Sequence, residues 1–390
     1  MTRALFHYSL LHVGGAEKSS LRLLQALVER GWDITLVLTT GGGALEHEVD
    51  PRIRLVRLRP GAYGLRFMAA KGPLGRLFAI PDLAAYCLAR VIGCIRMLPF
   101  LFQRYDMAAT LLQGTSSWFC RRMVRAKVRV HWIRSDLQGA DKKGHLAARL
   151  RRSAFEIDHF VCVSEVTRAS FAAAVPEAAH KACVIYNVLN ANDMLVRARE
   201  GTDPFPPRAD GELRILTVCR LFESAKGLRR MARVCARLRD HGFNFRWFVV
   251  GDGPDQSLLE REIDDLGLRN SMILMGRMAN PFPAYMNADI VAMLSQYEGL
   301  CGVVNEAKVV GRPVVATRVS GIEEQLVDHR TGLIVANDED AIVEGMRLIL
   351  SDRSLREALA NSHLPPALCD DAAKVQRLEE MLAGKDDTCE

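Results

Sequence analysis

The chain alternates short apolar segments with longer amphipathic ones along its whole length. The segment from Glu17 to Arg30 carries leucines at helical spacing, and Gly31 follows it as a helix stop. Apolar segments of strand length recur through the first half, at Ala4–Tyr8, Asp33–Thr39, Met107–Leu112, Val128–Ile133 and His159–Val163. Strand, helix and strand in succession predict a doubly wound parallel sheet.

The second half repeats this alternation. Its predicted strands are Leu213–Cys219, Phe245–Val250, Met272–Leu274, Asp289–Leu294, Pro313–Ala316 and Gly332–Val335. Between the halves, residues 200–211 read EGTDPFPPRADG, which is typical of a linker. We therefore expect an α/β protein with Rossmann-like domains over residues 1–198 and 199–368, whose carboxyl strand edges face a cleft, and a helical tail over 369–390 that packs back toward the first domain.

Composition narrows the class of protein. The 390 residues are 49% hydrophobic and 25% charged, as in a globular protein, and the net charge of +6 is too small to indicate nucleic acid without a basic patch. Ten cysteines include no C-x-x-C pair, which indicates reduced thiols, and those within apolar segments, such as Cys87, Cys94 and Cys162, are expected to be buried. No secretory signal pattern follows the first residues, so we expect a cytoplasmic location.

Four motifs follow predicted strands. Glu298 and Glu306 flank Gly299, Leu300, Cys301, Gly302 and Val303, where glycines give phosphate oxygens access to backbone N–H groups and carboxylates accept hydrogen bonds from sugar hydroxyls. Arg220 and Lys226 follow another strand and suit a diphosphate, although a solvated charge pair fits equally well. Gly251, Asp252 and Gly253 form a third turn, and Gly14, Gly15, Ala16 and Glu17 a fourth; each also fits a plain tight turn.

In this order, the motifs resemble those of the retaining glycosyltransferases of family 4. The segments Pro313–Thr317 and Ser320–Glu324, and in the first half Val161–Ser164 and Val184–Asn187, are similar to further signatures of that family. The resemblance implies the GT-B fold, a UDP-sugar or GDP-sugar donor, retention at the anomeric carbon, and no metal or other cofactor.

The resemblance also implies residue roles. Arg220 and Lys226 would bind the diphosphate, Glu298 the donor sugar and Glu306 the ribose hydroxyls. The backbone of Gly299, Leu300, Cys301, Gly302 and Val303 would contact sugar and phosphate. Arg277 and Met278 would pass near the base, with Gly251, Asp252 and Gly253 completing the donor set and Gly15 approaching the phosphates from the first domain.

The sequence departs from the family pattern at several positions. Cys301 stands where glycine or proline is common, and Ser320 replaces a glycine. Relatives have a histidine about where Arg134 stands, whereas here His131 comes three residues earlier. We consider Arg134 as a phosphate ligand, Asp136 as an acceptor contact and His131 as either an acceptor contact or a structural histidine.

An acceptor on the first domain is expected to be a glycan or lipid-linked. Basic residues between Arg121 and Arg152 fit either an anionic membrane surface or solvated helix faces. The apolar stretch Leu88–Phe102 contains Pro99 and is shorter than the roughly 20 residues of a spanning helix, so we expect it to lie in the membrane interface with Arg76, Arg90, Arg96 and Arg104 rather than to cross.

The favoured function is a glycosyltransferase of cell-surface polysaccharide or glycolipid synthesis. A sugar-nucleotide epimerase of the same fold and a catalytically degenerate binding module are the alternatives. A nicotinamide dehydrogenase is disfavoured because the first turn, from Gly14 to Lys18, lacks the three-glycine fingerprint. The sequence leaves open the base, the sugar, the acceptor and the oligomeric state.

Overall fold

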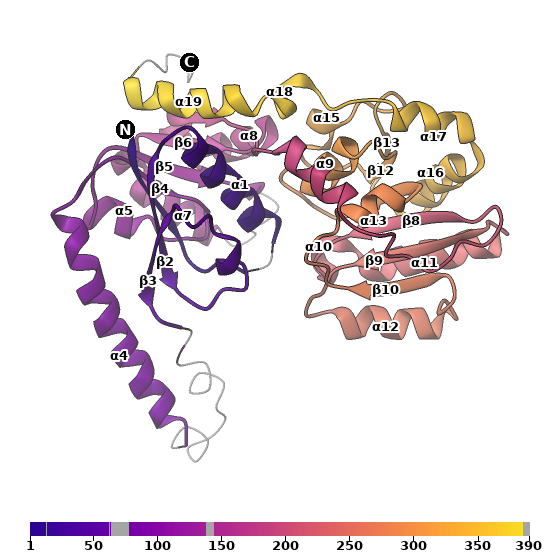
Figure 1. The fold of residues 1–390 in the computed structure, drawn as a ribbon, viewed down its shortest axis with the longest axis horizontal. Coiled ribbons are helices and arrows are strands. Elements are labelled where there is room, and N and C mark those ends of the chain that lie inside the picture. The colour runs from indigo at the N-terminus through magenta and orange to yellow at the C-terminus, as the bar shows by residue number, and fades with distance from the viewer. Residues whose placement is uncertain (13, 62, 64–77, 138–143, 385–390) are drawn as a thin grey trace. The chain divides into compact units, whose positions relative to one another are not determined.

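The chain forms two compact units, which are described one at a time (Figure 1). The computed structural model describes residues 1–12, 14–61, 63, 78–137 and 144–384. Unit 1 consists of Met1–Val163, Thr167–Val188 and the chain from Ala372 onward. Unit 2 consists of Ser164–Val166 and Leu189–Asp371, so the division comes earlier in the chain than the expected one between residues 198 and 199.

Unit 1 is built on a seven-stranded parallel sheet in the order β3-β2-β1-β4-β5-β6-β7. The strands are β1 Arg3–Tyr8, β2 Asp33–Thr40, β3 Arg54–Arg59, β4 Arg104–Thr110, β5 Arg125–Ile133, β6 His159–Cys162 and β7 Ala182–Val184. The central strands read as continuous apolar runs because helices cover both faces of such a sheet. Accordingly, Leu5, Phe6, Leu36 and Ala108 have no exposed surface.

Helices connect these strands. They are α1 Gly15–Glu29, η1 Glu46–Glu48, α4 Ile80–Met97, η2 Leu98–Leu101, α5 Trp118–Arg122, α7 His145–Ser153, η3 Ala154–Glu156, α8 Glu165–Ala174, η4 Pro176–Lys181 and α19 Asp371–Ala383. In α1, Leu24 and Leu27 are fully buried on the face that the leucine spacing predicted. Apart from its first residue, α19 belongs to unit 1, where Lys374 Nζ donates a hydrogen bond of 3.0 Å to the Asn187 carbonyl.

Unit 2 is built on a six-stranded parallel sheet in the order β10-β9-β8-β11-β12-β13. The strands are β8 Leu213–Val218, β9 Phe245–Val250, β10 Met272–Gly276, β11 Ile290–Met293, β12 Val314–Thr317 and β13 Leu333–Val335. Trp247, Val249 and Ile290 are fully buried between this sheet and the helices that cover one of its faces. Each of these strands overlaps a segment that the apolar pattern predicted.

The helices of unit 2 follow the same alternation. They are α9 Ala191–Arg199, α10 Glu223–Lys226, α11 Leu228–Asp240, α12 Gln256–Asp265, α13 Phe282–Asn287, α14 Gly302–Val309, α15 Ile322–Gln325, α16 Glu339–Ser351, α17 Arg353–Ala360 and α18 Pro366–Cys369. Strand, helix and parallel strand therefore repeat through the unit. The carboxyl ends of its strands all meet at one edge of the sheet, where the turns that carry the predicted donor-site residues begin.

Helix α9 and the segment predicted to link two domains, which follows it, both pack on the rest of unit 2. The Arg197 guanidinium of α9 lies 5.2 Å from the centre of the Phe282 ring in α13, and Asn280 Nδ2 donates a hydrogen bond of 2.8 Å to the Arg197 carbonyl. Within the proline-rich segment, Asp203 Oδ2 accepts a hydrogen bond of 2.7 Å from Arg214 Nη1 on β8. These contacts explain why unit 2 already begins at Leu189.

Helix α4 and the short turn η2 differ from what the sequence indicated. Together they span Ile80–Leu101, 22 residues that contain an 18-residue window with a mean hydropathy of 1.5, and within the described residues this is the one helix long and apolar enough to cross a membrane. The prediction that the stretch is too short to span a bilayer was wrong. It counted the stretch from Leu88, whereas the helix begins at Ile80. Cys87 and Cys94, expected to be buried, are exposed because the apolar side of the helix faces outward.

Candidate active site

Lys226 and Glu298 lie at the topological switch point of unit 2, the place where the order of the strands in the sheet changes direction. From β8 the strand order runs outward through β9 and β10 on one side, and from β11 through β12 and β13 on the other. Open parallel sheets bind ligands at such a point, beyond the carboxyl ends of the two central strands. Lys226 follows β8 and Glu298 follows β11, and the Gln296 N–H donates a hydrogen bond of 2.7 Å to the Ala225 carbonyl, which ties the two loops together.

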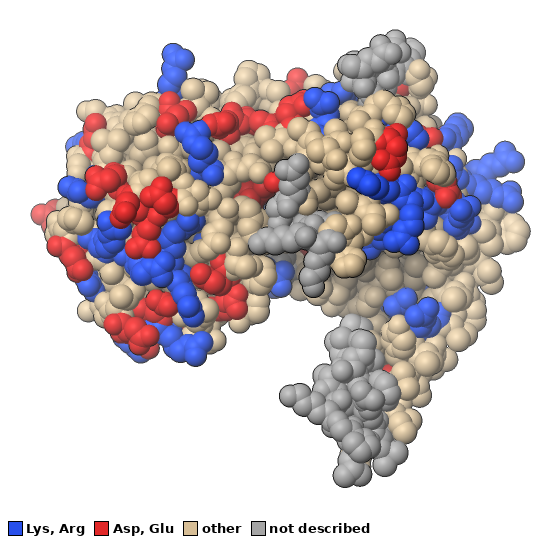
Figure 2. Space-filling view, turned by 180° about the vertical axis from the view of Figure 1, so that it is seen from behind, with Lys and Arg blue, Asp and Glu red and all other residues tan. Residues whose placement is uncertain are grey.

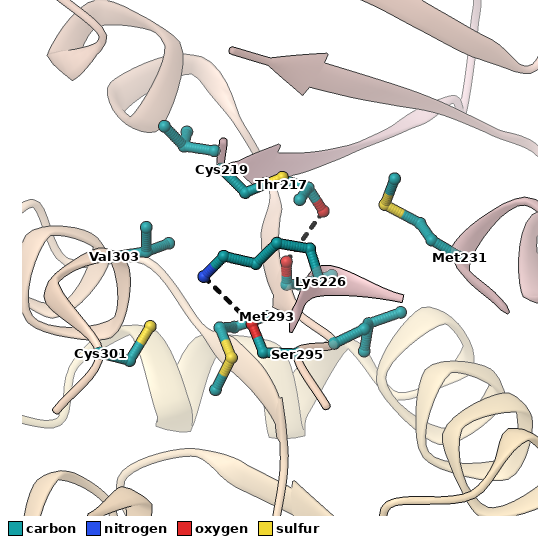
Figure 3. Close-up of a pocket in the computed structure, with 11 residues that line it drawn as sticks. Thr217, Cys219, Lys226, Met231, Met293, Ser295, Cys301 and Val303 are labelled. Atoms are coloured by element: carbon teal, nitrogen blue, oxygen red, sulfur yellow. Dashed lines mark hydrogen bonds between the residues drawn. The ribbon is translucent and has the colours of Figure 1, made fainter. Parts of the chain in front are cut away.

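Lys226 and Glu298 form an ion pair across this point. Lys226 Nζ donates a hydrogen bond to Glu298 Oε1, which also accepts one of 2.7 Å from Ser295 Oγ. Lys226 Nζ lies 3.4 Å from Ser295 Oγ at the mouth of a small pocket lined also by Thr217, Cys219 and Cys301 (Figure 3). Within the described part of the chain, no hydrogen bond to Glu298 Oε2 is present, so this oxygen is available to a sugar hydroxyl.

The Glu298 carboxylate keeps the Lys226 ammonium group protonated. Burial alone would lower the pKa of the ammonium group, but the Glu298 carboxylate beside it holds that pKa above its usual range. Both side chains are about one fifth exposed, at 21% for Lys226 and 17% for Glu298. The Lys226 ammonium group therefore stays protonated and remains accessible from solvent.

Glu306 is held by a tyrosine. It lies on α14, and its Oε2 accepts a hydrogen bond of 3.0 Å from the hydroxyl of Tyr285 on α13. Tyr285 has no exposed surface, whereas Glu306 is partly exposed. A buried donor of this kind fixes one carboxylate oxygen and thereby sets the direction of the other.

Hydrogen bonds from Gln325 hold the glycine-rich turn before α14 in place. Gln325 of α15 bonds both backbone groups of Cys301: its Oε1 accepts from the Cys301 N–H at 3.0 Å, and its Nε2 donates to the Cys301 carbonyl at 2.8 Å. The Cys301 N–H is therefore already paired, and burial raises the pKa of its thiol to about 12, which keeps the thiol neutral. The following Gly302 is exposed and opens α14, where unpaired N–H groups favour anions.

The turn of Gly251, Asp252 and Gly253 packs closely on the end of β8. A Cβ atom on Gly251 would lie 1.8 Å from the Cys219 carbonyl oxygen, and one on Gly253 would lie 2.3 Å from that of Leu221. The Gly251 N–H is bonded to the Gly276 carbonyl at 2.9 Å. These glycines therefore have a structural reason to be present, and Asp252 is exposed beside them.

The remaining predicted donor residues of unit 2 lie after strand ends. Arg220 follows β8 and Arg277 follows β10, and both side chains are exposed; Met278 is partly exposed. Leu300 and Val303 are also partly exposed, and Val303 lines the pocket beside Lys226. The Gly299 carbonyl accepts a hydrogen bond of 3.3 Å from Ser164 Oγ.

Gly15 belongs to unit 1, where it opens helix α1. A Cβ atom at this glycine would meet nothing within 4 Å, so the start of the helix is open. Gly14 immediately before it has an extended backbone, and the carbonyl of Gly14 accepts the Lys18 N–H at 3.1 Å. The first amides of α1 thus lie at the carboxyl end of β1, where the sheet of unit 1 changes direction.

Arg134 is buried in unit 1 and bonded on several sides. Its Nε donates to the Leu111 carbonyl at 2.8 Å, and its Nη1 donates to Ser19 Oγ at 3.1 Å and to Asn187 Oδ1 at 2.9 Å. Burial lowers the pKa of the guanidinium to about 10, so it stays charged near neutral pH. The side chain thereby joins α1 to the ends of β4 and β7. These contacts give Arg134 a structural role.

The two other predicted acceptor residues also lie inside unit 1. His131 is 2% exposed and stacks on Phe160 at 6.0 Å between ring centres. Asp136 Oδ1 accepts a hydrogen bond of 2.5 Å from Ser170 Oγ of α8. Their acceptor roles stay predictions, and the buried position of His131 favours its structural alternative.

The sequence did not single out Tyr285, Ser295 or Gln325. Ser295 follows the apolar run of β11 and precedes Glu298 by three residues, so its place at a strand end was a usable signal. Gln325 adjoins the predicted signature ending at Glu324, whose carboxylate accepts the backbone N–H groups of Glu165 and Val166 at 2.8 and 3.0 Å. Among the residues that the structure describes, no cluster of three or more His, Cys, Asp or Glu side chains is arranged as a metal site.

The fold of the chain is that of the GT-B glycosyltransferases. The solved structure of Anabaena HepE in complex with UDP and glucose has a TM-score of 0.72 to this chain, covers 98% of it and is covered in full, at 19% sequence identity. Residues 13–193 match the model of Glycosyltransferase Family 4, and residues 199–363 match the model of Glycosyl transferases group 1. The chain therefore belongs to this family of glycosyltransferases.

Two curated relatives act on lipid-linked sugars according to their names. One is a GDP-mannose-dependent alpha-(1-6)-phosphatidylinositol monomannoside mannosyltransferase of Mycolicibacterium smegmatis, 30% identical over 60% of this chain and 65% of that protein. The other is an N-acetylgalactosamine-N,N'-diacetylbacillosaminyl-diphospho-undecaprenol 4-alpha-N-acetylgalactosaminyltransferase of Campylobacter jejuni, 30% identical over 42% of this chain and 44% of that protein. The matches to these two relatives thus span 44% and 65% of their lengths.

Proposed function

We propose that the protein is a retaining glycosyltransferase. It moves a sugar from a UDP-sugar or GDP-sugar to a glycan or lipid-linked acceptor in the synthesis of a cell-surface polysaccharide or glycolipid. The observation that carries this proposal is the Lys226–Glu298 pair at the point where the sheet of unit 2 changes direction, with Glu306 on the adjoining helix.

The chemistry of these side chains suits a nucleotide sugar. The Lys226 ammonium and the exposed Arg220 guanidinium stabilise negative charge on a diphosphate as it departs. Glu298 offers its second oxygen to a sugar hydroxyl, and Glu306, oriented by Tyr285, accepts from the ribose. Arg277 and Met278 flank the base, and the first amides of α14 approach the phosphates.

The reaction itself needs no protein nucleophile. The bond between the anomeric carbon and the phosphate oxygen breaks, the acceptor oxygen bonds to that carbon on the same face, and the departing phosphate takes the acceptor proton. The protein contributes positioning and electrostatic stabilisation, and loss of one preorganised donor typically lowers turnover about 10²–10³-fold. No metal or other cofactor enters this proposal.

The relatives and the thiols of the chain support a proposal for the acceptor and the location. Both named relatives act on an acceptor that carries a lipid, which favours a lipid-linked acceptor here. Such acceptors are presented at a membrane surface, and the thiols that the structure describes are free. We therefore propose a cytoplasmic enzyme that works at the inner face of the cytoplasmic membrane.

A thermal-shift screen with UDP, GDP, ADP and their sugars identifies the donor, because a ligand of the native state raises the melting temperature by mass action. The Lys226→Ala variant is then expected to lose turnover at least about a hundredfold with the fold intact. Lys127→Ala, which removes a lysine exposed at 75%, serves as the matched control. The anomeric configuration of the product, read by NMR, tests retention.

Other outcomes distinguish the alternatives. A change of the free nucleotide sugar at a ring carbon without acceptor would indicate an epimerase. Binding of a nucleotide sugar with no transfer to any lipid-linked or glycan acceptor would indicate a degenerate binding module. Near-normal turnover of Lys226→Ala would contradict the proposed site.

A further inference from the structure

Helix α4 carries an uninterrupted apolar stripe on its solvent side. At about 100° per residue, its exposed apolar side chains other than Pro81 in the first turn fall within a sector of about 120°. They are Ile80, Ala84, Cys87, Leu88, Val91, Cys94, Ile95 and, at the start of η2, Leu98. The five larger ones, Ile80, Leu88, Val91, Ile95 and Leu98, are between 49% and 61% exposed. We call these eight residues the α4 stripe; it is about 27 Å long at 1.5 Å per residue.

The opposite side of α4 packs on unit 1 through small residues. Ala89 is 3% exposed and Gly93 is buried, and a Cβ atom on Gly93 would lie 3.6 Å from the Leu58 carbonyl oxygen of β3. Arg96 Nη1 donates a hydrogen bond of 2.7 Å to the Arg57 carbonyl of the same strand. The helix is thus attached by its small-residue side and exposes its large apolar side, the reverse of an ordinary surface helix.

The charges beside the α4 stripe are positive. From Ile80 to Leu101 the charged residues are Asp82, Arg90 and Arg96. Arg90 borders the stripe, whereas Arg96 lies toward the packed side, where it bonds the Arg57 carbonyl. Asp82 falls on the side opposite to the stripe, and the exposed Arg104 follows the helix. In Figure 2, the part of unit 1 that carries α4 is largely tan, with blue groups near it. Apolar surface bordered by cations is complementary to an anionic lipid surface.

We propose that the α4 stripe is a membrane-docking surface that lies in the interface of an anionic bilayer. The large apolar side chains enter the boundary between headgroups and acyl chains, and Arg90 and Arg104 contact lipid phosphates. This inference does not depend on the transfer reaction, because it needs neither donor nor acceptor.

Two other occupants of the stripe are disfavoured by the structure. A helix that crosses the bilayer is surrounded by lipid, whereas Ala89, Gly93 and Arg96 hold one side of α4 against β3. A second copy of the chain, paired by a two-fold axis at the middle of the stripe, would bring Arg90 of each copy beside Arg90 of the other. Such like charges are repulsive, and Asp82, the only acidic residue of the helix, lies on the far side.

Vesicle flotation of the full chain without donor tests the proposal. We expect co-flotation with vesicles that contain phosphatidylglycerol, and weaker binding to pure phosphatidylcholine or at high salt. The double variant Leu88→Gln and Ile95→Gln is expected to lower the partition coefficient at least about tenfold, because both side chains lose apolar contact with lipid. Arg90→Gln is expected to lower it about fivefold, and only with anionic vesicles.

A matched control separates the stripe from general surface hydrophobicity. Val196→Gln with Leu348→Gln removes two apolar side chains of unit 2, exposed at 54% and 40%, and is expected to leave flotation unchanged. A fluorescent label on Cys94, in a variant with Cys87→Ala, Cys369→Ala and Cys389→Ala, reports contact directly. Its emission is expected to shift to the blue when anionic vesicles are added.

The proposal is overturned by any of four results. Absence of co-flotation at low salt excludes membrane docking, and an equal loss in the control variant excludes the stripe as its cause. Resistance of the bound protein to carbonate extraction would indicate a spanning helix. Self-association in sedimentation equilibrium that the stripe variant abolishes, without vesicle binding, would assign the stripe to a second copy of the chain.

Discussion

The hydroxyl of Tyr285 donates a hydrogen bond of 3.0 Å to Oε2 of Glu306, and this bond joins α13 to α14 in unit 2. Because Tyr285 is fully buried, the hydroxyl has a fixed position. Glu306 is the residue proposed to accept hydrogen bonds from the ribose. The tyrosine is therefore expected to orient that carboxylate without touching the donor.

Tyr285→Phe removes this hydroxyl and leaves the ring in place. We expect about a tenfold loss of affinity for the nucleoside diphosphate, since a hydrogen bond to a charged group is worth about 1.5–3 kcal/mol, and an unchanged kcat at saturating donor. The loss should be much smaller for the 2′-deoxy nucleotide, which lacks a hydroxyl for Glu306 to bind. Tyr105→Phe in unit 1, which removes the bond from another buried tyrosine to Gln103, is the control. Equal losses for both nucleotides would contradict an orienting role.

Arg134→Met tests whether the buried guanidinium is structural. The change leaves the Leu111 carbonyl, Ser19 and Asn187 without their partner, and we expect the free energy of unfolding to fall by about 3 kcal/mol. Thermal unfolding measures the effect, with the exposed Arg104→Met as the control. An unchanged melting temperature combined with a large loss of turnover would instead support the acceptor role that the sequence indicated.

Two histidines of unit 1 predict a loss of stability in acid. Burial lowers the pKa of His7 to about 4 and that of His131 to about 3, and Arg149 and Arg121 add to the effect at His131, while the Leu112 backbone opposes it. In the unfolded chain both titrate near 6.5, so the unfolded state binds more protons and stability falls as the pH drops below that value. At about pH 5 each neutral histidine lowers the free energy of unfolding by about 2 kcal/mol relative to neutral pH.

Urea unfolding at about pH 7.5 and about pH 5 tests whether the free energy of unfolding falls on acidification. His131→Leu removes one of the two groups, so the variant should lose about 2 kcal/mol less than the wild type on acidification. Parallel losses in both proteins would show that His131 is not held neutral by the fold.

Gly251→Ala tests the close packing of the turn after β9. The added Cβ atom would meet the Cys219 carbonyl oxygen at 1.8 Å, so the end of β8 must shift, and the glycine φ of +142° is also unfavourable for alanine. Gly242 has a φ of +80° but no atom within 4 Å of a Cβ, so Gly242→Ala carries backbone strain alone. We expect a loss of about 1 kcal/mol at Gly242 and a clearly larger one at Gly251, measured by thermal unfolding. Equal losses would exclude the steric account.

Much of the fold was predictable because buried parallel strands are apolar throughout. Phe245–Val250 was predicted with its observed bounds, and the other strands of unit 2 within a few residues. Strand β3 was missed because it lies at the sheet edge, where arginines alternate with apolar residues and no continuous apolar run appears. Strand β7, at the opposite edge, is only three residues long.

The site was predictable in kind but not in its contacts. Lys226 and Glu298 lie in loops that follow a strand, and Glu306 lies in the helix that follows Glu298, which the local pattern reveals. That Lys226 meets Glu298 depends on β8 lying beside β11, and strand order is not encoded locally. The partnership of Tyr285 with Glu306 depends likewise on the packing of two helices.

For a related reason, the sequence could not predict that the apolar side of α4 faces outward. Hydrophobic periodicity tells which side chains share a face of a helix, but it does not tell which face meets the protein. The small residues Ala89 and Gly93 form the packed side, and the large ones form the α4 stripe. The expectation that Cys87 and Cys94 are buried failed because it assumed the opposite orientation.

The most direct test of the donor site is calorimetric titration of wild type and Lys226→Ala with the nucleoside diphosphate that the thermal screen selects and with the corresponding nucleoside. The account predicts that the variant loses at least about tenfold in affinity for the diphosphate and nothing for the nucleoside, because Lys226 acts on the phosphates alone. Equal affinity of both proteins for the diphosphate, or an equal loss for the nucleoside, would contradict it.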